Sequence, residues 1–355
     1  MARPGAPPCL RASAPPCLSV SVVKFANVLK CPVLSGLLNA IPVIPINPLY
    51  RPPGVATFPG PRHRPIMIRM TALSRKITLS DLRSARENGD KIAMLTCYDY
   101  TTARLMQEAG VPLLLVGDSA GNVVLGYDST LPVSLDFMIE ITAAVRRGAP
   151  LALLVADMPF GSYHEGIAQG VHNVCRMMQL SGADCVKLEV ADSHLTLVRA
   201  LADAGVAVMA HLGLRPQSVG VLGGYKAQGR TAVAAAAIVD LAVRAEQAGA
   251  AAILLEAVPP EVSERVVQKT SLPVIGCGAG PACHGSVVVT HDMVGLTPKA
   301  PKFVPVLANV AQTLTGLFSE YVEQVASGDY PSPEHIYPMP PEEKTKFAGL
   351  NNQER

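Results

Sequence analysis

Residues 183–211 read ADCVKLEVADSHLTLVRALADAGVAVMAH, and this stretch holds the pattern that decides the fold. A short run rich in branched residues, Asp184–Leu188, is followed by an amphipathic stretch, His194–Gly205, and by a second such run, Val206–Ala210. Near-continuous apolar runs are typical of strands buried on both faces, as in parallel sheets. A glycine that closes the middle stretch is a typical helix end. The segment therefore predicts a strand, a helix and a second strand.

The same alternation extends from residue 90 to residue 290. The predicted strands are Ile92–Cys97, Pro112–Gly117, Leu151–Ala156, Asp184–Leu188, Val206–Ala210, Ala252–Leu255, Pro273–Gly276 and Val287–Thr290. The predicted helices are Thr101–Gly110, Leu135–Gly148, Gly166–Gly182, His194–Gly205 and Thr231–Gly249. Eight strands in roughly 250 residues, with too little chain left for a second domain, favour a closed (β/α)₈ TIM barrel over an open doubly wound sheet. One connection, Gly278–Ser286, is too short for a full helix.

Composition agrees with one large α/β domain flanked by tails. Apolar residues make up 49% of the 355 residues and charged residues 16%, with no Trp, so the core must be aliphatic. This content excludes a disordered chain, which lacks the apolar surface to offset chain entropy. The eight cysteines include no C-x-x-C pair, so neither a zinc site nor a disulfide framework is indicated.

The net charge of +2 combines two opposite segments. The first 80 residues contain ten Lys or Arg, no Asp or Glu, and 14 of the 31 prolines, which leaves 20 basic against 28 acidic residues in the remainder. We divide the chain into a basic, proline-rich leader (1–70), a catalytic barrel (71–341) and a polar tail (342–355).

The leader has two interpretations. A basic, acid-free segment is typical of organelle transit peptides and predicts a mitochondrial location, although its prolines interrupt the usual amphipathic helix. Alternatively, Met67 or Met70 is the true start, the leader is a disordered extension, and the protein is cytoplasmic. The apolar run Pro32–Leu49 contains three internal prolines and cannot form a spanning helix, so no membrane anchor is expected.

Polar residues follow six of the eight predicted strands. They are Asp118-Ser119, Asp157, Lys187-Leu188-Glu189, His211, Glu256 and His291-Asp292. Any one of them has an ordinary explanation as a helix cap or an ion pair. A closed barrel nevertheless brings the carboxyl ends of all its strands to one mouth, where the active sites of such barrels lie. The sequence therefore predicts one polar site built from several strands.

The residue types at this mouth suggest a metal-assisted reaction. Asp118, Asp157 and Glu189 are hard oxygen ligands of the kind that hold Mg²⁺. Lys187, two residues before Glu189, points to the same side of its strand, into the barrel. A cation beside a metal suits a site that stabilises a developing oxyanion, and His211 could bind the same substrate oxygens or be an ordinary core histidine.

Glu256 follows an apolar run, and such surroundings raise the pKa of a carboxyl group toward the range of a general base. It could instead only support His211 or Lys187. The segment Gly223–Arg230 has the composition of a lid or anion-binding loop, without a P-loop pattern. The segment Gly276–Gly280 contains three glycines, and we interpret it as backbone that leaves room for close packing beside a ligand.

The chain resembles ketopantoate hydroxymethyltransferases, the 3-methyl-2-oxobutanoate hydroxymethyltransferases of pantothenate biosynthesis, from about Lys91 to Tyr337. The motifs that carry the resemblance are Thr96-Cys97-Tyr98-Asp99, Val116-Gly117-Asp118-Ser119, Gly126–Val133, Ala144–Gly148, Ala156–Phe160, Val186-Lys187-Leu188-Glu189, His211-Leu212-Gly213-Leu214, Gly223-Gly224-Tyr225-Lys226, Pro273–Gly276, His291-Asp292 and Tyr330-Pro331. So many motifs in order are highly specific.

The resemblance implies a barrel of the phosphoenolpyruvate/pyruvate type. The implied enzyme is a one-carbon transferase that moves a hydroxymethyl group from 5,10-methylenetetrahydrofolate to 3-methyl-2-oxobutanoate, giving 2-dehydropantoate through a Mg²⁺-assisted enolate. The resemblance also implies a homo-oligomer, often a decamer, with no nucleic-acid partner. Matching positions make Asp118, Asp157 and Glu189 metal ligands, Asp118, Ser119, Asp157, Lys187 and His211 substrate-binding residues, and Glu256 the catalytic proton acceptor.

Two positions depart from the family pattern. Val190 replaces a usual glycine, and Arg215 stands where Thr is common. Both leave the proposed catalytic set intact but put the substrate loop and the folate contacts in question. Two alternatives stay open: a Mg²⁺-dependent carbon–carbon lyase or mutase of the same barrel group, and a non-catalytic barrel subunit.

Overall fold

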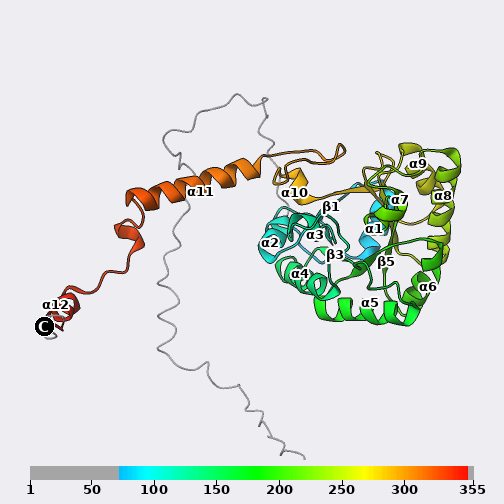
Figure 1. Ribbon diagram of the computed structural model, residues 1–355. Helices are drawn as coiled ribbons and strands as arrows, with labels where there is room; N and C mark the ends of the chain where they lie inside the picture. Colours follow the sequence, from blue (N-terminus) through cyan, green and yellow to red (C-terminus); the bar gives the residue numbers. More distant parts are fainter. Residues whose placement is uncertain (1–71, 351–355) are drawn as a thin grey trace, which may run out of the picture. The chain divides into compact units, whose positions relative to one another are not determined.

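The computed structural model, which describes residues 72–350, contains a closed barrel of eight parallel strands surrounded by helices (Figure 1). Each strand pairs with the next along the chain, and β8 closes on β1. The strands are β1 (Ile92–Thr96), β2 (Leu113–Val116), β3 (Leu153–Asp157), β4 (Cys185–Glu189), β5 (Val208–Gly213), β6 (Ala252–Glu256), β7 (Val274–Cys277) and β8 (Gly285–Val288). Each overlaps one of the eight predicted runs, with β5 and β8 displaced by two or three residues, so the predicted barrel is confirmed.

Helices follow most of the strands, as the amphipathic stretches predicted. The longer ones are α1 (Leu79–Asn88), α2 (Tyr100–Glu108), α4 (Leu135–Gly148), α5 (Ile167–Ser181), α6 (Leu195–Asp203), α8 (Ala232–Gln247), α9 (Pro260–Lys269), α11 (Val310–Ser327) and α12 (Pro341–Leu350). Single turns are α3 (Ala120–Val123), α7 (Val219–Leu222), α10 (Thr290–Met293) and the 3₁₀ segments η1 (Asp192–His194), η2 (Pro216–Ser218) and η3 (Pro333–His335). The connection from β7 to β8 contains no helix, as expected from its length.

Local sequence signals explain where these helices begin and end. Asp99 and Ser134 accept backbone N–H groups at the starts of α2 and α4, as N-cap residues do. Gly182 closes α5 with φ +71° and a hydrogen bond to the Met178 carbonyl, a left-handed conformation that glycine adopts without strain. On α8, Arg244 donates to Asp240 at 2.7 Å, a pair of opposite charges one turn apart.

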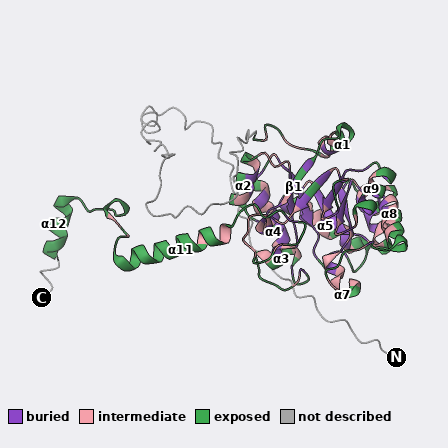
Figure 2. Ribbon diagram, turned by 90° about the horizontal axis from the view of Figure 1, so that it is seen from above, coloured by how far each residue is buried: buried purple, intermediate pink, exposed green. Residues whose placement is uncertain are grey.

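Side-chain alternation along the strands creates two apolar layers. One set of positions fills the barrel, including Leu113, Leu153, Cys185, Met209 and Leu254. The alternate positions pack between the strands and the helices. Figure 2 shows most of the strand residues as buried. Because side chains on one face recur every second residue, the inward positions arrive at polar residues where β3 to β6 end.

Other expectations concern the parts outside the barrel. The leader 1–70, with Cys9, Cys17 and Cys31, lies outside the described residues, whereas the five described cysteines are free thiols. Within residues 72–350, no helix is long and apolar enough to cross a membrane. The predicted tail begins in α12, and none of the residues of α11 or α12 is buried.

Candidate active site

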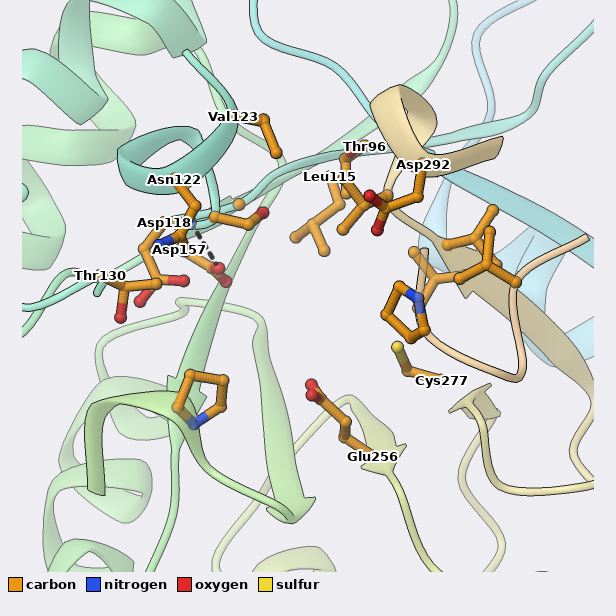
Figure 3. Close-up of a pocket in the computed structure, with 18 of the residues that line it drawn as sticks. Thr96, Leu115, Asp118, Asn122, Val123, Thr130, Asp157, Glu256, Cys277 and Asp292 are labelled. Atoms are coloured by element: carbon orange, nitrogen blue, oxygen red, sulfur yellow. Dashed lines mark hydrogen bonds between the residues drawn. The ribbon is translucent and has the colours of Figure 1, made fainter. Parts of the chain in front are cut away.

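The carboxyl ends of the strands surround a cavity of about 550 Å³ (Figure 3). Seven of the residues singled out at the strand ends line it: Asp118, Ser119, Asp157, Lys187, His211, Glu256 and Asp292. Glu189 and His291 do not line it, although both lie beside residues that do. The structure thus brings together side chains from β2 to β6 and from the turn after β8, as the strand-end pattern predicted.

Two aspartates from neighbouring strands meet at one end of this cavity. Asp157, the last residue of β3, accepts the backbone N–H of Asp118 at Oδ2, at 3.0 Å (Figure 3). Both residues are at least 95% buried. The hydroxyl of Ser119 lies 2.9 Å from that of Tyr98, which fixes the side of the cavity next to Asp118. Burial, together with the charge of Asp118 and against the attraction of Lys187, raises the pKa of Asp157 to about 7.

Gln217, in η2, holds two of the carboxylates in place and was not identified from the sequence. Its Nε2 donates to Asp118 Oδ2 at 2.8 Å and to a backbone carbonyl at 3.0 Å. Its backbone N–H donates to Glu189 Oε1 at 3.0 Å, and its Oε1 accepts the Tyr163 hydroxyl at 2.8 Å. A glutamine in an irregular loop belongs to no periodic pattern, and the sequence signal nearest to it is the motif His211–Leu214, which ends three residues before it.

Glu189 stands behind the two aspartates and away from the cavity wall. It is 96% buried, and its Oε2 has no hydrogen-bond partner among the described residues. Burial is the main reason that the pKa of Glu189 rises to about 8, against the attraction of Lys187 and with repulsion from Asp118 and Asp157. Among residues 72–350, Lys187 is the lysine whose charge acts on this group of three carboxylates, Asp118, Asp157 and Glu189.

Lys187 begins a line of contacts that crosses the mouth from the aspartates to Glu256. Its Nζ lies 2.8 Å from Asp157 Oδ1 and 3.1 Å from His211 Nδ1. Burial opposes the charge of Lys187 most strongly, but the surrounding carboxylates outweigh it and raise the pKa of Lys187. The lysine therefore stays an ammonium group, which can only donate hydrogen bonds.

The tautomer of His211 follows from this contact. Because Nδ1 accepts from Lys187, the proton of the neutral ring resides on Nε2, which lies 3.3 Å from Glu256 Oε2. Burial and the nearby lysine hold the pKa of His211 well below its usual value, so the ring is neutral. His211 is thus neither an isolated core histidine nor a second cation.

Glu256 lies between the two sides of the cavity in Figure 3. Burial raises the pKa of Glu256 to about 7, with Lys187 acting in the opposite direction. This is the shift predicted from its apolar surroundings, and it suits a general base near neutral pH. Cys277, which also lines the cavity, has a pKa raised well above its usual value by burial and by Glu256, so its thiol is protonated and a weak nucleophile.

Comparisons with known proteins identify the family. The family model described as ketopantoate hydroxymethyltransferase matches residues 76–333. The chain belongs to the ketopantoate hydroxymethyltransferase family. It is 47% identical over 264 residues to the 3-methyl-2-oxobutanoate hydroxymethyltransferase of Thermobifida fusca (strain YX), covering 74% of this chain and 94% of that protein. It is 47% identical over 271 residues to the enzyme of the same name from Geobacillus kaustophilus (strain HTA426), covering 76% and 97%.

Solved structures share the barrel fold of this ketopantoate hydroxymethyltransferase family member. A putative phosphonomutase from Burkholderia cenocepacia J2315 aligns with TM-score 0.51 at 16% identity, over 68% of this chain and 97% of that one. A phosphonopyruvate hydrolase aligns with TM-score 0.50 at 14% identity, over 78% and 96%. At these identities the likeness concerns the fold alone, and it agrees with the predicted (β/α)₈ barrel.

The donor set of this family member fits a Mg²⁺ ion held by few protein ligands. Among residues 72–350, no group of three or more His, Cys, Asp or Glu side chains forms a ready metal cage. Mg²⁺ is usually held by one or two carboxylates, with water and substrate oxygens completing its shell. Asp118 and Asp157 line the cavity side by side, and the partnerless oxygen of Glu189 lies in the same acidic cluster.

The two departures from the family pattern lie next to each other. Arg215 donates from Nη1 to the backbone carbonyl of Val190 at 3.2 Å, and Val190 is fully buried. Neither residue lines the cavity, so the departures leave its wall unchanged. In the glycine-rich segment 223–230, Tyr225 is the residue that reaches the cavity.

Proposed function

We propose that the protein transfers a hydroxymethyl group from 5,10-methylenetetrahydrofolate to 3-methyl-2-oxobutanoate, giving 2-dehydropantoate in pantothenate biosynthesis. The observation that carries this proposal is the line of contacts from Asp157 through Lys187 and His211 to Glu256. It connects an acidic pair suited to a cation with a carboxyl group whose pKa is raised to about 7. The family membership of the chain supports this reaction.

The reaction needs a carbon acid activated beside a carbonyl group. The C3–H bond of the oxo acid breaks, and the carboxylate of Glu256 takes the proton. A new bond then joins C3 to the one-carbon unit of the donor, one water supplies the hydroxyl oxygen, and tetrahydrofolate leaves. Glu256 is the base in this proposal because it lines the cavity and, within the part of the chain that the structure describes, forms no ion pair with a Lys or Arg side chain.

The other residues stabilise the negative charge that forms on the oxo group. Mg²⁺, held by Asp118 and Asp157 with Glu189 behind them, would act as a Lewis acid toward the oxygens of the oxo acid. Lys187 keeps a buried positive charge at this end of the cavity. His211 presents an N–H group that needs no proton transfer before it donates. Ser119 supplies a hydroxyl from the cavity wall.

A reconstituted assay tests this function. Purified protein is incubated with 3-methyl-2-oxobutanoate, 5,10-methylenetetrahydrofolate and Mg²⁺, and 2-dehydropantoate and tetrahydrofolate are quantified. We expect equimolar formation of both products and dependence on all three additions. Cleavage or rearrangement of the oxo acid without folate would instead indicate a lyase or mutase. The absence of any reaction would favour a non-catalytic subunit.

The exposed face of α11 supports association of several copies, which we propose as well. The helix has no buried residue, and Leu317, Phe318, Tyr321, Val322 and Val325 are all exposed. A contiguous apolar surface of this kind usually marks an interaction site. Mass photometry of the full chain is expected to show an oligomer, and replacement of Phe318 and Val322 by Ser should shift the distribution toward smaller species.

For the leader, which lies outside the described residues, we propose a mitochondrial address. A fusion of residues 1–70 to a fluorescent protein should accumulate in mitochondria. Mass spectrometry of the mature N-terminus then distinguishes cleavage of a leader from a cytoplasmic protein that starts at Met67 or Met70.

A further inference from the structure

The cavity at the barrel mouth has two chemically different ends (Figure 3). Asp118, Asp157 and Thr130 lie at one end, Asp292 and Cys277 lie at the other, and Glu256 lies between them. The volume of about 550 Å³ is within the range of ~300–1,000 Å³ typical of cavities that enclose drug-sized ligands. A five-carbon oxo acid at the acidic end leaves the opposite end of this space unfilled.

Apolar side chains dominate the wall of that opposite end. They come from the end of β8 and from the segment 301–304, and they are Val287, Val288, Val289, Pro301, Phe303 and Val304. Three polar residues interrupt this wall: Asp292, Thr297 and Lys299. A mostly apolar pocket with a few placed polar groups is the usual form of a site for a planar organic ligand.

Asp292 is a buried carboxylate with spare hydrogen-bonding capacity. It is 92% buried, and its Oδ1 accepts the Thr297 hydroxyl at 2.5 Å. No other donor within residues 72–350 forms a hydrogen bond to this carboxylate, which offers about four acceptor positions. Its backbone is fixed because the neighbouring Thr290 donates twice to Thr96 of β1, at 3.0 and 2.6 Å. The carboxylate of Asp292 is therefore held in a fixed position, and most of its hydrogen-bond acceptor positions have no donor among the described residues.

Phe303 supplies the aromatic surface of this end. Its ring packs directly on Gly278, where a Cβ atom would lie 2.6 Å from the ring, so only glycine leaves room for it. The ring nevertheless stays 40% exposed and lines the cavity. This contact accounts for one glycine of the segment 276–280, which the sequence indicated as packing room beside a ligand.

We infer that this end of the cavity, built around Asp292 and Phe303, binds the pterin ring of the folate co-substrate. The inference rests on the proposed function. A pterin carries a ring N–H and an exocyclic amino group side by side, and a carboxylate accepts two such parallel donors in a paired arrangement. Phe303 and the valines of β8 contact the ring face, which suits offset stacking. Lys299, exposed at the rim, is placed to attract the carboxylates of the folate tail.

This placement also gives Glu256 a position between the two substrates. The base lies between the acidic end and the pterin end (Figure 3). The oxo acid, once Glu256 has removed its C3 proton, would then meet the one-carbon unit of the folate bound at the Asp292 end of the cavity. One cavity then holds the acceptor, the base and the donor in that order.

The decisive variant is Asp292→Asn. Asparagine still accepts the Thr297 hydroxyl through its amide oxygen, so the loop keeps its anchor, but it presents an amide donor where the pterin donors arrive. Loss of a charge-assisted pair of hydrogen bonds should raise the KM for 5,10-methylenetetrahydrofolate and the calorimetric Kd for tetrahydrofolate by about 10-fold or more. Asp128→Asn is the matched control, because Asp128 lines the same cavity and stands two residues before Thr130, which lies at the acidic end (Figure 3). We expect less than about a twofold change there.

A donor-free measurement separates this inference from the proposed function. Exchange of the C3 hydrogen of 3-methyl-2-oxobutanoate in D₂O with Mg²⁺ requires the acidic end and Glu256 only. Retained exchange in Asp292→Asn together with weakened tetrahydrofolate binding supports the subsite. Unchanged binding, or loss of exchange in parallel with binding, overturns it while wild-type product formation still supports the reaction. If the wild-type protein neither exchanges hydrogen nor forms product, the proposed function fails and the subsite with it.

Discussion

The protonation state of Glu256 should control the rate of C3–H exchange. The pKa of this carboxyl group is raised to about 7, and only its ionised form can accept the substrate proton. A raised pKa means that the group is protonated over a wider range of pH than an ordinary glutamate. Exchange should therefore be slow in acid, increase as the pH passes through 7, and level off above it.

The size of the effect follows from the pKa. At pH 6 about one tenth of the Glu256 side chains are ionised, and at pH 8 about nine tenths are, so the exchange rate should differ by about tenfold between these values. The variant Glu256→Gln has no titrating base at this position. Its rate should be lower by about 10²- to 10⁴-fold, with no step near pH 7 and with little change in the affinity for the oxo acid.

Deuterium exchange followed by NMR at saturating oxo acid measures both quantities. The pKa values of Asp157 and Glu189 are raised as well, so Mg²⁺ must be saturating at every pH. The control is a second pH series at a higher Mg²⁺ concentration. A rise in exchange rate caused by cation binding shifts to another pH when the Mg²⁺ concentration changes, whereas a rise caused by ionisation of Glu256 does not. A step near pH 4.5, or wild-type exchange by Glu256→Gln, would refute the assignment.

Three further changes test the other parts of the site. Asp157→Asn should raise the Mg²⁺ concentration for half-maximal turnover by about tenfold or more, and an unchanged Mg²⁺ titration would discredit the ligand assignment. Gln217→Leu leaves three buried groups unpaired: Asp118, one backbone carbonyl and the Tyr163 hydroxyl. At about 1–3 kcal/mol each, urea unfolding should show a loss of about 3–9 kcal/mol, and a loss below about 1 kcal/mol would contradict this. Gly278→Ala should displace Phe303 and raise the KM for 5,10-methylenetetrahydrofolate more than that for the oxo acid, and equal effects on both would argue against the pterin subsite.

The barrel could be predicted because its signals repeat. Each buried strand is an apolar run, and the two-residue alternation that places Cys185 inside the barrel also places Lys187 and Glu189 there. Strand boundaries were less predictable. β5 extends to Gly213, and β8 starts at Gly285, because pairing with the neighbouring strands, rather than local hydrophobicity, sets where a strand ends.

The residues that sequence reasoning missed lie in irregular segments. Gln217 and Phe303 reach the site from loops whose paths depend on tertiary contacts, so no spacing rule places them. The same cause separates Glu189 from the cavity. Its strand points it inward, but the Gln217 loop packs against it. The sequence predicted that Glu189 points into the barrel, because it follows the alternation along its strand. It could not predict that a loop covers this side chain.

The attachment of α10 to β1 has a consequence for the order in which the protein folds. Thr290 and Thr96 are 194 residues apart along the chain, and their bonds form only when β8 closes on β1. Contacts between distant segments form late, because the intervening chain must first be ordered. The side of the mouth that would bind the oxo acid is built from β2 to β6, which pair in the order in which they occur along the chain. This side should therefore form earlier. A chain released before residue 304 would therefore lack a complete pterin end, so two-substrate chemistry is a property of the finished chain.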